Sequence, residues 1–331
     1  MANNRIEMDN GVTILTLAAE EFGGEYNQRS LFYISGLWIM SFWAMATNVI
    51  QALFMKISKK QKHSFRKVLW DMGRDPKHFS CFFGDRFSRY NHLAKVGAAS
   101  WRALDIFYNY HENVKPQLGN NIEGWLTHHW MEKLQNRQAV ANRLKVAVRL
   151  LSKVFGESIN EPEIRLLSVA SGSAQAIIGA IKGQPGIKVR AVLIDNDPTA
   201  IDQAKEIARA AEIENSFTFV CDRTTVLEKV CADFKPHIIE MVGFLDYRPK
   251  GQAIKLIKRV ISSLPEEGIF ITCNINKNSE KPLLDWVLLW PMFYRNEAEF
   301  LELLIEGGFS PEKIQLIYEP FRIHGLAVCR K

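Results

Sequence analysis

A stretch of small residues and a later acidic residue carry the clearest chemical signal in the chain. Residues 167–174, Leu-Ser-Val-Ala-Ser-Gly-Ser-Ala, end one apolar run, and a second apolar run ends at Asp195. Small side chains at a strand-to-helix turn let a ligand approach backbone N–H groups at the positive end of the helix dipole. A carboxylate at the end of the next strand can accept both hydrogen bonds of a ribose diol. Gly172 and Asp195 are 23 positions apart, near the roughly 20 typical of a dinucleotide site, so the pattern predicts a βαβ nucleotide site.

Over about residues 160–331 the chain resembles the class I S-adenosylmethionine-dependent methyltransferases. Their glycine loop, Asp/Glu-x-Gly-x-Gly-x-Gly, aligns with residues 168–174, where only the middle glycine is kept. The resemblance implies S-adenosylmethionine as the cofactor. Ser168 stands where the family has its leading acid, so it would have to act there through its hydroxyl or a water. The loop residues that the resemblance places at the cofactor are Ser168, Ala170, Gly172 and Ser173.

Two later segments also resemble the family's cofactor motifs. Residues 193–198, Leu-Ile-Asp-Asn-Asp-Pro, resemble the second motif, which implies Asp195 as the ribose ligand with Asn196 beside it. Residues 219–222, Phe-Val-Cys-Asp, resemble the third motif. This match implies that Asp222 lies near the adenine amino group.

The methyl donor and its acceptor are expected to meet after the fourth strand. Residues 241–247, Met-Val-Gly-Phe-Leu-Asp-Tyr, resemble the family's segment at this place, with Gly243 on the cofactor side. Methyl transfer is an in-line displacement that needs alignment, and it needs a base only when the acceptor must lose a proton. Asp246 is a candidate base, or an ordinary loop carboxylate or helix cap. Tyr247 is a candidate for orienting the acceptor, or a packing residue.

Substrate-side candidates follow the fifth predicted strand. Asn274 ends that strand at the carboxyl edge, where open α/β sheets bind ligands. Tyr294 and Arg295 belong to an aromatic and charged cluster suited to a pocket wall. Arg295 fits either an acidic substrate or a salt bridge with Asp285.

Other functions fit parts of the pattern. A nicotinamide dehydrogenase normally has Gly-x-Gly-x-x-Gly, whereas this loop has one glycine. The loop would also serve as a plain strand-to-helix turn, or belong to a methyltransferase-like scaffold that binds cofactor weakly. Base-modifying relatives carry Asn/Asp-Pro-Pro-aromatic after the fourth strand. Residues 243–247 lack it, so a small-molecule or lipid-like acceptor is favoured over nucleic acid.

The elements that position these residues alternate regularly from residue 164 onward. Near-continuous apolar runs predict a parallel sheet covered on both faces. The fold class is therefore α/β, with a Rossmann-like, mostly parallel sheet of seven strands as the family resemblance implies, and a helical N-terminal domain. The predicted strands are 164–169, 189–195, 216–221, 237–243 and 268–274, with a closing antiparallel pair at 313–318 and 323–329.

The 331 residues, 47% hydrophobic and 24% charged, suit two globular domains or one domain with a large extension. We expect a flexible lead over 1–30, a helical accessory or lid domain over 31–155, and the methyltransferase domain over 160–331. The net charge of +6 favours anionic surroundings only weakly. The five cysteines have no paired spacing, which indicates a reducing, cytoplasmic location. The histidines lack companion cysteines at zinc spacing, so no metal site is expected.

Residues 31–55 pose the main question outside the predicted site. These 25 residues contain no charge, and about 20 apolar residues suffice to cross a bilayer. Aromatic residues and the following lysines, from Lys56 onward, suit an anionic membrane surface. Polar residues such as Asn48 and Gln51 dilute the hydrophobicity. The segment therefore fits a membrane span or in-plane anchor, or a buried helix of the accessory domain. The oligomeric state is not determined by the sequence.

Overall fold

The structure, a computed structural model, is built on a mostly parallel sheet of nine strands in the order β1-β2-β8-β9-β7-β6-β3-β4-β5. It describes residues 4–7, 11–22, 29–58, 64–78, 88–158 and 161–331. Strands β3 to β7 pair in parallel, and β9 lies antiparallel between β7 and β8. The strands are β1 (Asn4–Glu7), β2 (Thr13–Thr16), β3 (Ile164–Val169), β4 (Val189–Asp195), β5 (Phe217–Cys221), β6 (Ile238–Met241), β7 (Ile269–Ile275), β8 (Ile314–Tyr318) and β9 (His324–Arg330).

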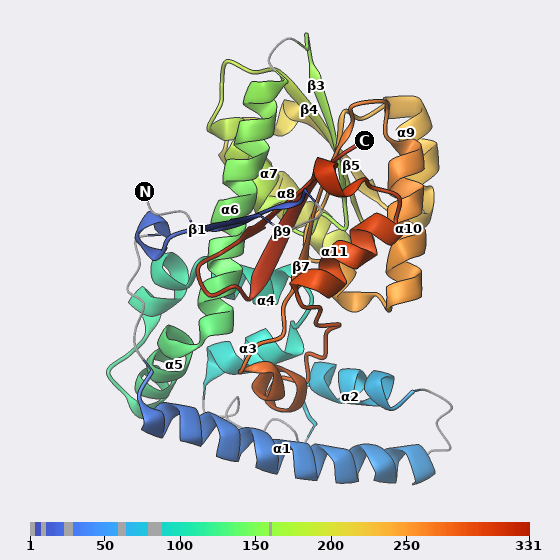
Figure 1. The fold of residues 1–331 in the computed structure, drawn as a ribbon. Coiled ribbons are helices and arrows are strands. Elements are labelled where there is room, and N and C mark those ends of the chain that lie inside the picture. The colour runs from blue at the N-terminus through green and yellow to red at the C-terminus, as the bar shows by residue number, and fades with distance from the viewer. Residues whose placement is uncertain (1–3, 8–10, 23–28, 59–63, 79–87, 159–160) are drawn as a thin grey trace. The chain divides into compact units, whose positions relative to one another are not determined.

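Helices cover both faces of this sheet, because its central strands are apolar on both sides. Every residue of β6 and β7 is buried. One face packs against α6 (Gln135–Glu157), α7 (Gln175–Lys182) and α8 (Pro198–Ala210). The other face packs against α9 (Leu227–Phe234), α10 (Lys250–Ser263) and α11 (Glu297–Glu306), as Figure 1 shows for α6 against α10 and α11. The result is the Rossmann-like α/β fold that the sequence predicted.

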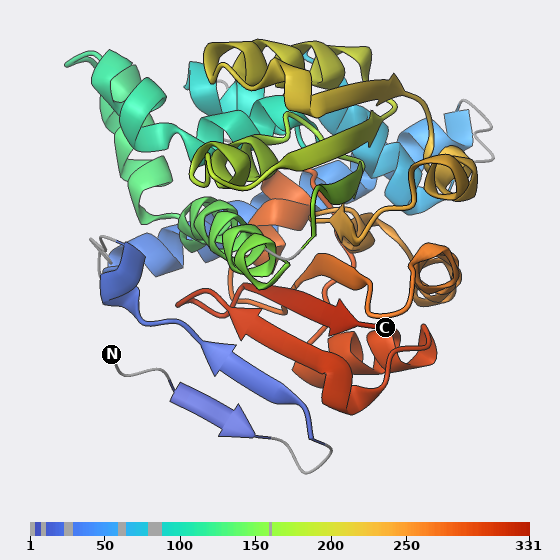
Figure 2. The same cartoon turned by 90° about the horizontal axis from the view of Figure 1, so that it is seen from above.

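The predicted seven strands are present as β3 to β9, and two more strands extend one edge. The sequence placed residues 13–16 in a flexible lead, which is wrong: they form β2, which pairs in parallel with β8. Seen from above in Figure 2, the blue strands β1 and β2 lie beside the red strands β8 and β9. Val12 and Ile14 are fully buried, and this burial holds the segment on the sheet. The fourth predicted strand, 237–243, is shorter than expected.

The chain divides into two structural units that are discontinuous in sequence. Unit 1 comprises residues 1–24, 142–277 and 293–331, and unit 2 comprises residues 25–141 and 278–292. The boundary therefore lies inside α6, and not near residue 155 as the sequence analysis expected. The helices among the described residues of unit 2, besides the first turns of α6, are α1 (Leu31–Ser58), α2 (Phe65–Arg74), α3 (Arg89–Val96), α4 (Trp101–Tyr108), η4 (Tyr110–Val114), η5 (Lys115–Gln117), α5 (Ile122–Lys133) and η9 (Leu283–Val287).

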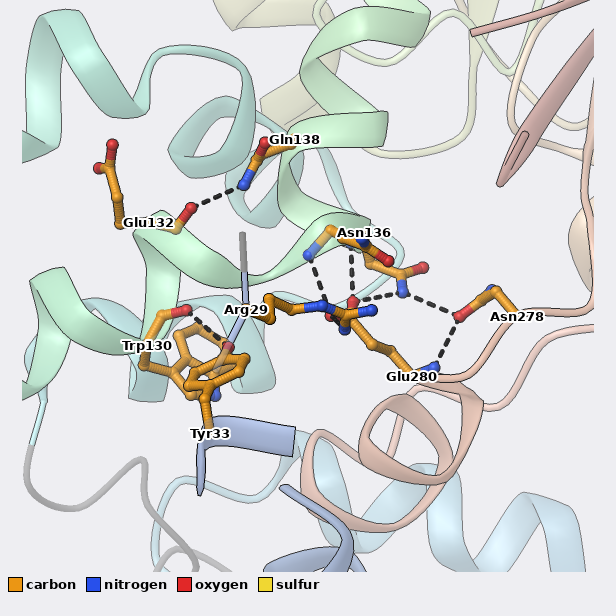
Figure 3. A network of polar contacts seen from close by, with 9 residues as sticks. Arg29, Tyr33, Trp130, Glu132, Asn136, Gln138, Asn278 and Glu280 are labelled. Atoms are coloured by element: carbon orange, nitrogen blue, oxygen red, sulfur yellow. Dashed lines mark hydrogen bonds and ion pairs between the residues drawn. The ribbon is translucent and has the colours of Figure 1, made fainter. Parts of the chain in front are cut away.

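A buried carboxylate ties the two sequence segments of unit 2 together. Glu280, which is 3% exposed, accepts hydrogen bonds from the backbone N–H groups of Gln135 (3.0 Å) and Asn136 (2.8 Å). It also accepts from the Asn136 side chain at 2.8 Å and pairs with Arg29 at 2.7 Å (Figure 3). Glu280 thereby satisfies N–H groups that the start of α6 would otherwise leave without partners, and its charge complements the helix dipole.

Helix α1 has one face packed inside unit 2 and one face exposed. Tyr33, Leu37 and Ala44 pack with Leu134 and with η9. Further along, the Asn48 side chain donates to the Trp286 carbonyl at 2.8 Å. The exposed face carries ten large apolar side chains that are 47–86% exposed: Leu31, Phe32, Trp38, Ile39, Phe42, Trp43, Ile50, Leu53, Phe54 and Ile57. In the described part of the chain, α1 is the one helix long and apolar enough to cross a membrane, and 22% of its most apolar 18-residue stretch is buried.

Candidate functional site

The predicted site residues gather at the carboxyl ends of the strands around β3. Strand β3 pairs with β4 on one side and with β6 on the other. From β3 the chain proceeds outward through β4 and β5, and it then returns to the other side of β3 as β6. Such a reversal of strand order leaves a crevice at the carboxyl ends, which is where open α/β sheets bind ligands.

The loop after β3 holds an unusual backbone. Ala170, Gly172 and Ala174 all have positive φ, at 56°, 55° and 53°. These are the three positions that align with the family's glycines, so two alanines keep a conformation that glycine adopts without strain. A non-glycine residue in the left-handed region costs about 1 kcal/mol or more. The loop retains its shape without the glycines that would favour it.

Asp195 is bonded directly to this loop. Its carboxylate accepts from the Gly172 N–H at 2.8 Å and from the Asp197 N–H at 2.9 Å. The side chain lies at the end of β4 with 9% of the residue exposed, and burial raises its pKa, against the lowering effect of these N–H groups. The Gly172 and Asp197 N–H groups bond different oxygens, and a further lone pair of the carboxylate can accept from a ligand hydroxyl.

The remaining residues of the second and third motifs lie beside Asp195. The Asp222 N–H donates to the Asp195 carbonyl at 3.0 Å, so the ends of β4 and β5 are joined. Asp222 and Asn196 are both exposed, and the Asp222 carboxylate accepts from the Arg223 N–H at 2.6 Å. Structure and sequence thus agree in placing Asp195, Asn196 and Asp222 at one edge of the sheet.

Ser168 does not face outward, as a direct ligand contact would require. It is fully buried, and its hydroxyl donates to the carboxylate of Glu240 on the neighbouring strand β6. Ser173 is also buried, and its hydroxyl accepts a 3.4 Å hydrogen bond from the Gln175 side chain. The sequence analysis missed Glu240. The available signal was an acid inside the apolar run Ile238-Ile239-Glu240-Met241.

Gly243 marks a close approach between the loop after β6 and α6. Its φ is 87°, and a Cβ atom there would lie 3.4 Å from a guanidinium nitrogen of Arg143. The Gly243 N–H donates to the Cys273 sulfur at 3.0 Å. Arg143 is 4% exposed, so α6 brings a buried cation to the carboxyl end of the sheet.

Asp246 is buried rather than exposed on a loop. It is 1% exposed, and its carboxylate accepts from the Ile275 N–H at 2.7 Å. Burial raises its pKa to about 6, while the nearby charges of Arg143 and Arg295 act to lower it. Tyr247 follows it at the end of η8 (Leu245–Tyr247) and is half-buried.

Two of the predicted substrate residues, Asn274 and Arg295, are buried and bonded to each other near Asp246. Arg295 donates to the side chain of Asn274 and to the backbone carbonyls of Leu245 (3.1 Å) and Arg248. The sequence left Arg295 to an acidic substrate or to a salt bridge with Asp285, and its guanidinium donates to the groups just named. Asp285 pairs instead with Lys281, one helical turn before it. Tyr294, beside Arg295, is 9% exposed.

Two observations concern metals and thiols. Within the described ranges, no group of three or more histidine, cysteine, aspartate or glutamate side chains could hold a metal ion. The described cysteines, Cys221, Cys231, Cys273 and Cys329, are thiols. Cys81 lies outside the described residues, as do Lys59, Lys60 and Lys62 of the basic segment after α1.

Comparison with known proteins gives a likeness of fold. No family model and no curated protein sequence matches the chain. A possible exported protein of Bordetella parapertussis is similar at 16% identity and a TM-score of 0.57, over 88% of this chain and 96% of that one. An O-methyltransferase family 2 protein of Planctomyces limnophilus, in complex with apigenin, has 15% identity and a TM-score of 0.43, over 76% of this chain and 95% of that one. Human N-acetylserotonin methyltransferase, in complex with S-adenosylmethionine, has 14% identity and a TM-score of 0.42, over 82% and 68%.

Proposed function

We propose that this protein is an S-adenosylmethionine-dependent methyltransferase that acts on a small-molecule or lipid-like acceptor. One observation carries the proposal: the strained loop 170–174 is bonded through the Gly172 N–H to the Asp195 carboxylate, beside the reversal of strand order. Strain of this kind persists at functional sites, where the surrounding structure maintains it. A loop that served only as a turn has no need of it.

The residues present fit a nucleoside cofactor with a ribose diol. Asp195 would accept the two ribose hydroxyls on its remaining lone pairs, and the exposed Asp222 would accept from the adenine amino group. When bound, S-adenosylmethionine supplies a methyl group on a sulfonium centre. The residues proposed to line the cofactor are Ala170, Gly172, Ser173, Asp195, Asn196, Asp222 and Gly243. Ser168, the remaining predicted residue, would act indirectly through its hydrogen bond to Glu240.

The protein's own task in such a transfer is alignment and, for a hydroxyl acceptor, proton removal. We assign proton removal to Asp246, because burial raises its pKa to about 6, nearer the range that suits a base at neutral pH. Tyr247 would orient the acceptor. Asn274, Tyr294 and Arg295 would form the pocket wall, with Arg295 holding Asn274 and the loop before α10 in place through its hydrogen bonds.

The exposed face of α1 favours a lipid-like acceptor or a membrane surface. Its large apolar side chains are interrupted by no charge between residues 30 and 55, and Lys56 follows. The other face of α1 packs against η9. A helix that spanned a bilayer would have to give up these contacts with unit 2. We therefore propose an in-plane contact with an anionic membrane surface, for a protein that is otherwise cytoplasmic.

Titration calorimetry with S-adenosylmethionine and S-adenosylhomocysteine tests the proposal. We expect binding by the unchanged protein and an affinity at least about 100-fold lower in Asp195→Ala, because two hydrogen bonds to a carboxylate are lost. Asp202→Ala, an exposed aspartate of α8, is the matched control and should bind normally. If the unchanged protein binds neither ligand, the enzyme proposal fails and a methyltransferase-like scaffold takes its place.

A further inference from the structure

Glu240 is a buried carboxylate on β6, hydrogen-bonded to Ser168 on the neighbouring strand β3. Ser168 and Glu240 are paired in register on the adjacent strands β3 and β6. The strand order reverses between these two strands. Glu240 is therefore an acid at the crevice, one strand away from the position where the glycine-loop pattern has its acid.

The neighbours of Glu240 hold its carboxylate in place and leave it able to accept further hydrogen bonds. One oxygen accepts from the Ser168 hydroxyl, and the other accepts from the Val242 N–H at 3.0 Å. A carboxylate has about four lone-pair sites, so two remain. Arg143 lies near enough for its charge to lower the pKa of Glu240, while burial raises that pKa to about 7.

Burying the Glu240 carboxylate in strand β6 costs free energy, and an apolar residue at this position would form the strand without that cost. Every residue of Ile238-Ile239-Glu240-Met241 is buried, and Glu240 is 6% exposed. Transferring a carboxylate out of water is unfavourable unless it is paired or hydrogen-bonded. The Ser168 hydroxyl, the Val242 N–H and the nearby charge of Arg143 compensate in part, and an ammonium group would add a direct ion pair.

We infer that Glu240, displaced from the glycine loop to strand β6, binds the α-ammonium group of the cofactor's methionine portion, with Ser168 positioning its carboxylate. The inference rests on the proposed function, since it assigns a residue to the same cofactor. It makes Ser168 a positioning residue and Glu240 the ligand contact. It also explains how the site functions without an acid at position 168.

The test compares two ligands that differ at the amino-acid end. S-adenosylhomocysteine carries the ammonium group, and 5′-methylthioadenosine has the same nucleoside without it. In Glu240→Gln, which keeps the shape and can still accept from Ser168, we expect the affinity for S-adenosylhomocysteine to fall about 10- to 100-fold. The affinity for 5′-methylthioadenosine should stay within about twofold. Asp195→Asn should weaken both ligands, because both contain the ribose.

Calorimetry on the full chain separates the outcomes, with thermal unfolding run on each variant to check the fold. Equal losses for both ligands in Glu240→Gln would assign Glu240 a structural role and overturn the inference. An unchanged affinity for S-adenosylhomocysteine would overturn it too, while leaving the proposed function standing. If the unchanged protein bound neither ligand, the proposed function would fail first, and this inference with it. Ser168→Ala should give a smaller loss with the same ligand selectivity.

Discussion

At the scale of single residues, the site depends on side chains whose environments differ from what their types suggest. Ala170 and Ala174 adopt the left-handed conformation that glycine normally provides. Glu240 and Asp246 are carboxylic acids buried almost completely, and burial raises the pKa of each, to about 7 and about 6. Each departure carries a free-energy cost, and all four residues lie in or beside the crevice proposed to bind the cofactor.

The strain in the loop after β3 can be measured at Ala170. Ala170→Gly should raise the free energy of unfolding by about 0.5 to 1 kcal/mol, because relief of the left-handed strain exceeds the added entropy of the unfolded chain. Chemical denaturation followed by tryptophan fluorescence gives this value. Ala232→Gly, at an exposed position in α9, is the control and should lower stability by about 1 kcal/mol. A loss of that size at Ala170 would contradict the strained backbone.

At the scale of elements, α1 shows how one sequence pattern can serve two environments. Its charge-free stretch fits a membrane span by length alone. In the structure, Tyr33, Leu37, Ala44 and Ala52 form a buried face, and the aromatic residues between them form an exposed one. Contiguous apolar surface of this kind marks an interaction site.

Introducing charge on the exposed face of α1 should weaken its contact with membranes. We expect the unchanged protein to sediment with vesicles that contain anionic lipid, and the double variant Trp38→Glu, Trp43→Glu to bind at least about tenfold more weakly. Trp125→Glu is the matched control, because Trp125 is also exposed, at 62%, but lies on α5.

Two results would contradict the membrane contact of α1. One is equal vesicle binding by all three proteins. The other is absence of vesicle binding by the unchanged protein together with self-association, measured by light scattering, that the α1 double variant removes. The second result would assign the exposed face to a contact between copies of the chain.

At the scale of the whole molecule, the chain builds each of its two units from separated segments. Residues 278–292 leave the sequence of unit 1 after β7 and belong to unit 2. Glu280 holds this segment in unit 2, because it caps the start of α6 and pairs with Arg29. The integrity of unit 2 should therefore depend on one buried carboxylate.

Removal of that carboxylate should loosen unit 2 selectively. Glu280→Ala leaves Arg29 and two backbone N–H groups without their partner, and breaking a buried ion pair costs roughly 3 kcal/mol or more. Hydrogen exchange read by mass spectrometry should show faster exchange over 31–57 and 122–141, with β3 to β7 unchanged. Glu266→Ala, which removes a highly exposed partner of Lys331, should change neither region. Equal acceleration in both units would show that Glu280 does not act locally.

The sequence by itself determined the features that arise within a continuous segment. Strands β3 and β4 begin and end where their apolar runs do, and Asp195 lies at the end of β4 as predicted. Small residues marked the loop around Gly172. These signals are readable because burial on both faces makes the whole strand apolar, and because small side chains at a strand-to-helix loop leave its backbone N–H groups accessible.

Only the tertiary structure decided the contacts between segments that are distant in sequence. The pairing of Ser168 with Glu240 spans 72 positions, and the bonds of Glu280 to α6 span 144 and 145. Strand register and strand order set such contacts. Neither can be predicted from the local pattern of apolar and polar residues in the segments concerned. The sequence therefore placed Asp195 and the loop around Gly172 at the carboxyl ends of their strands, whereas the position of Glu240, the buried bonds of Arg295 and the discontinuous units followed from the packing of the chain.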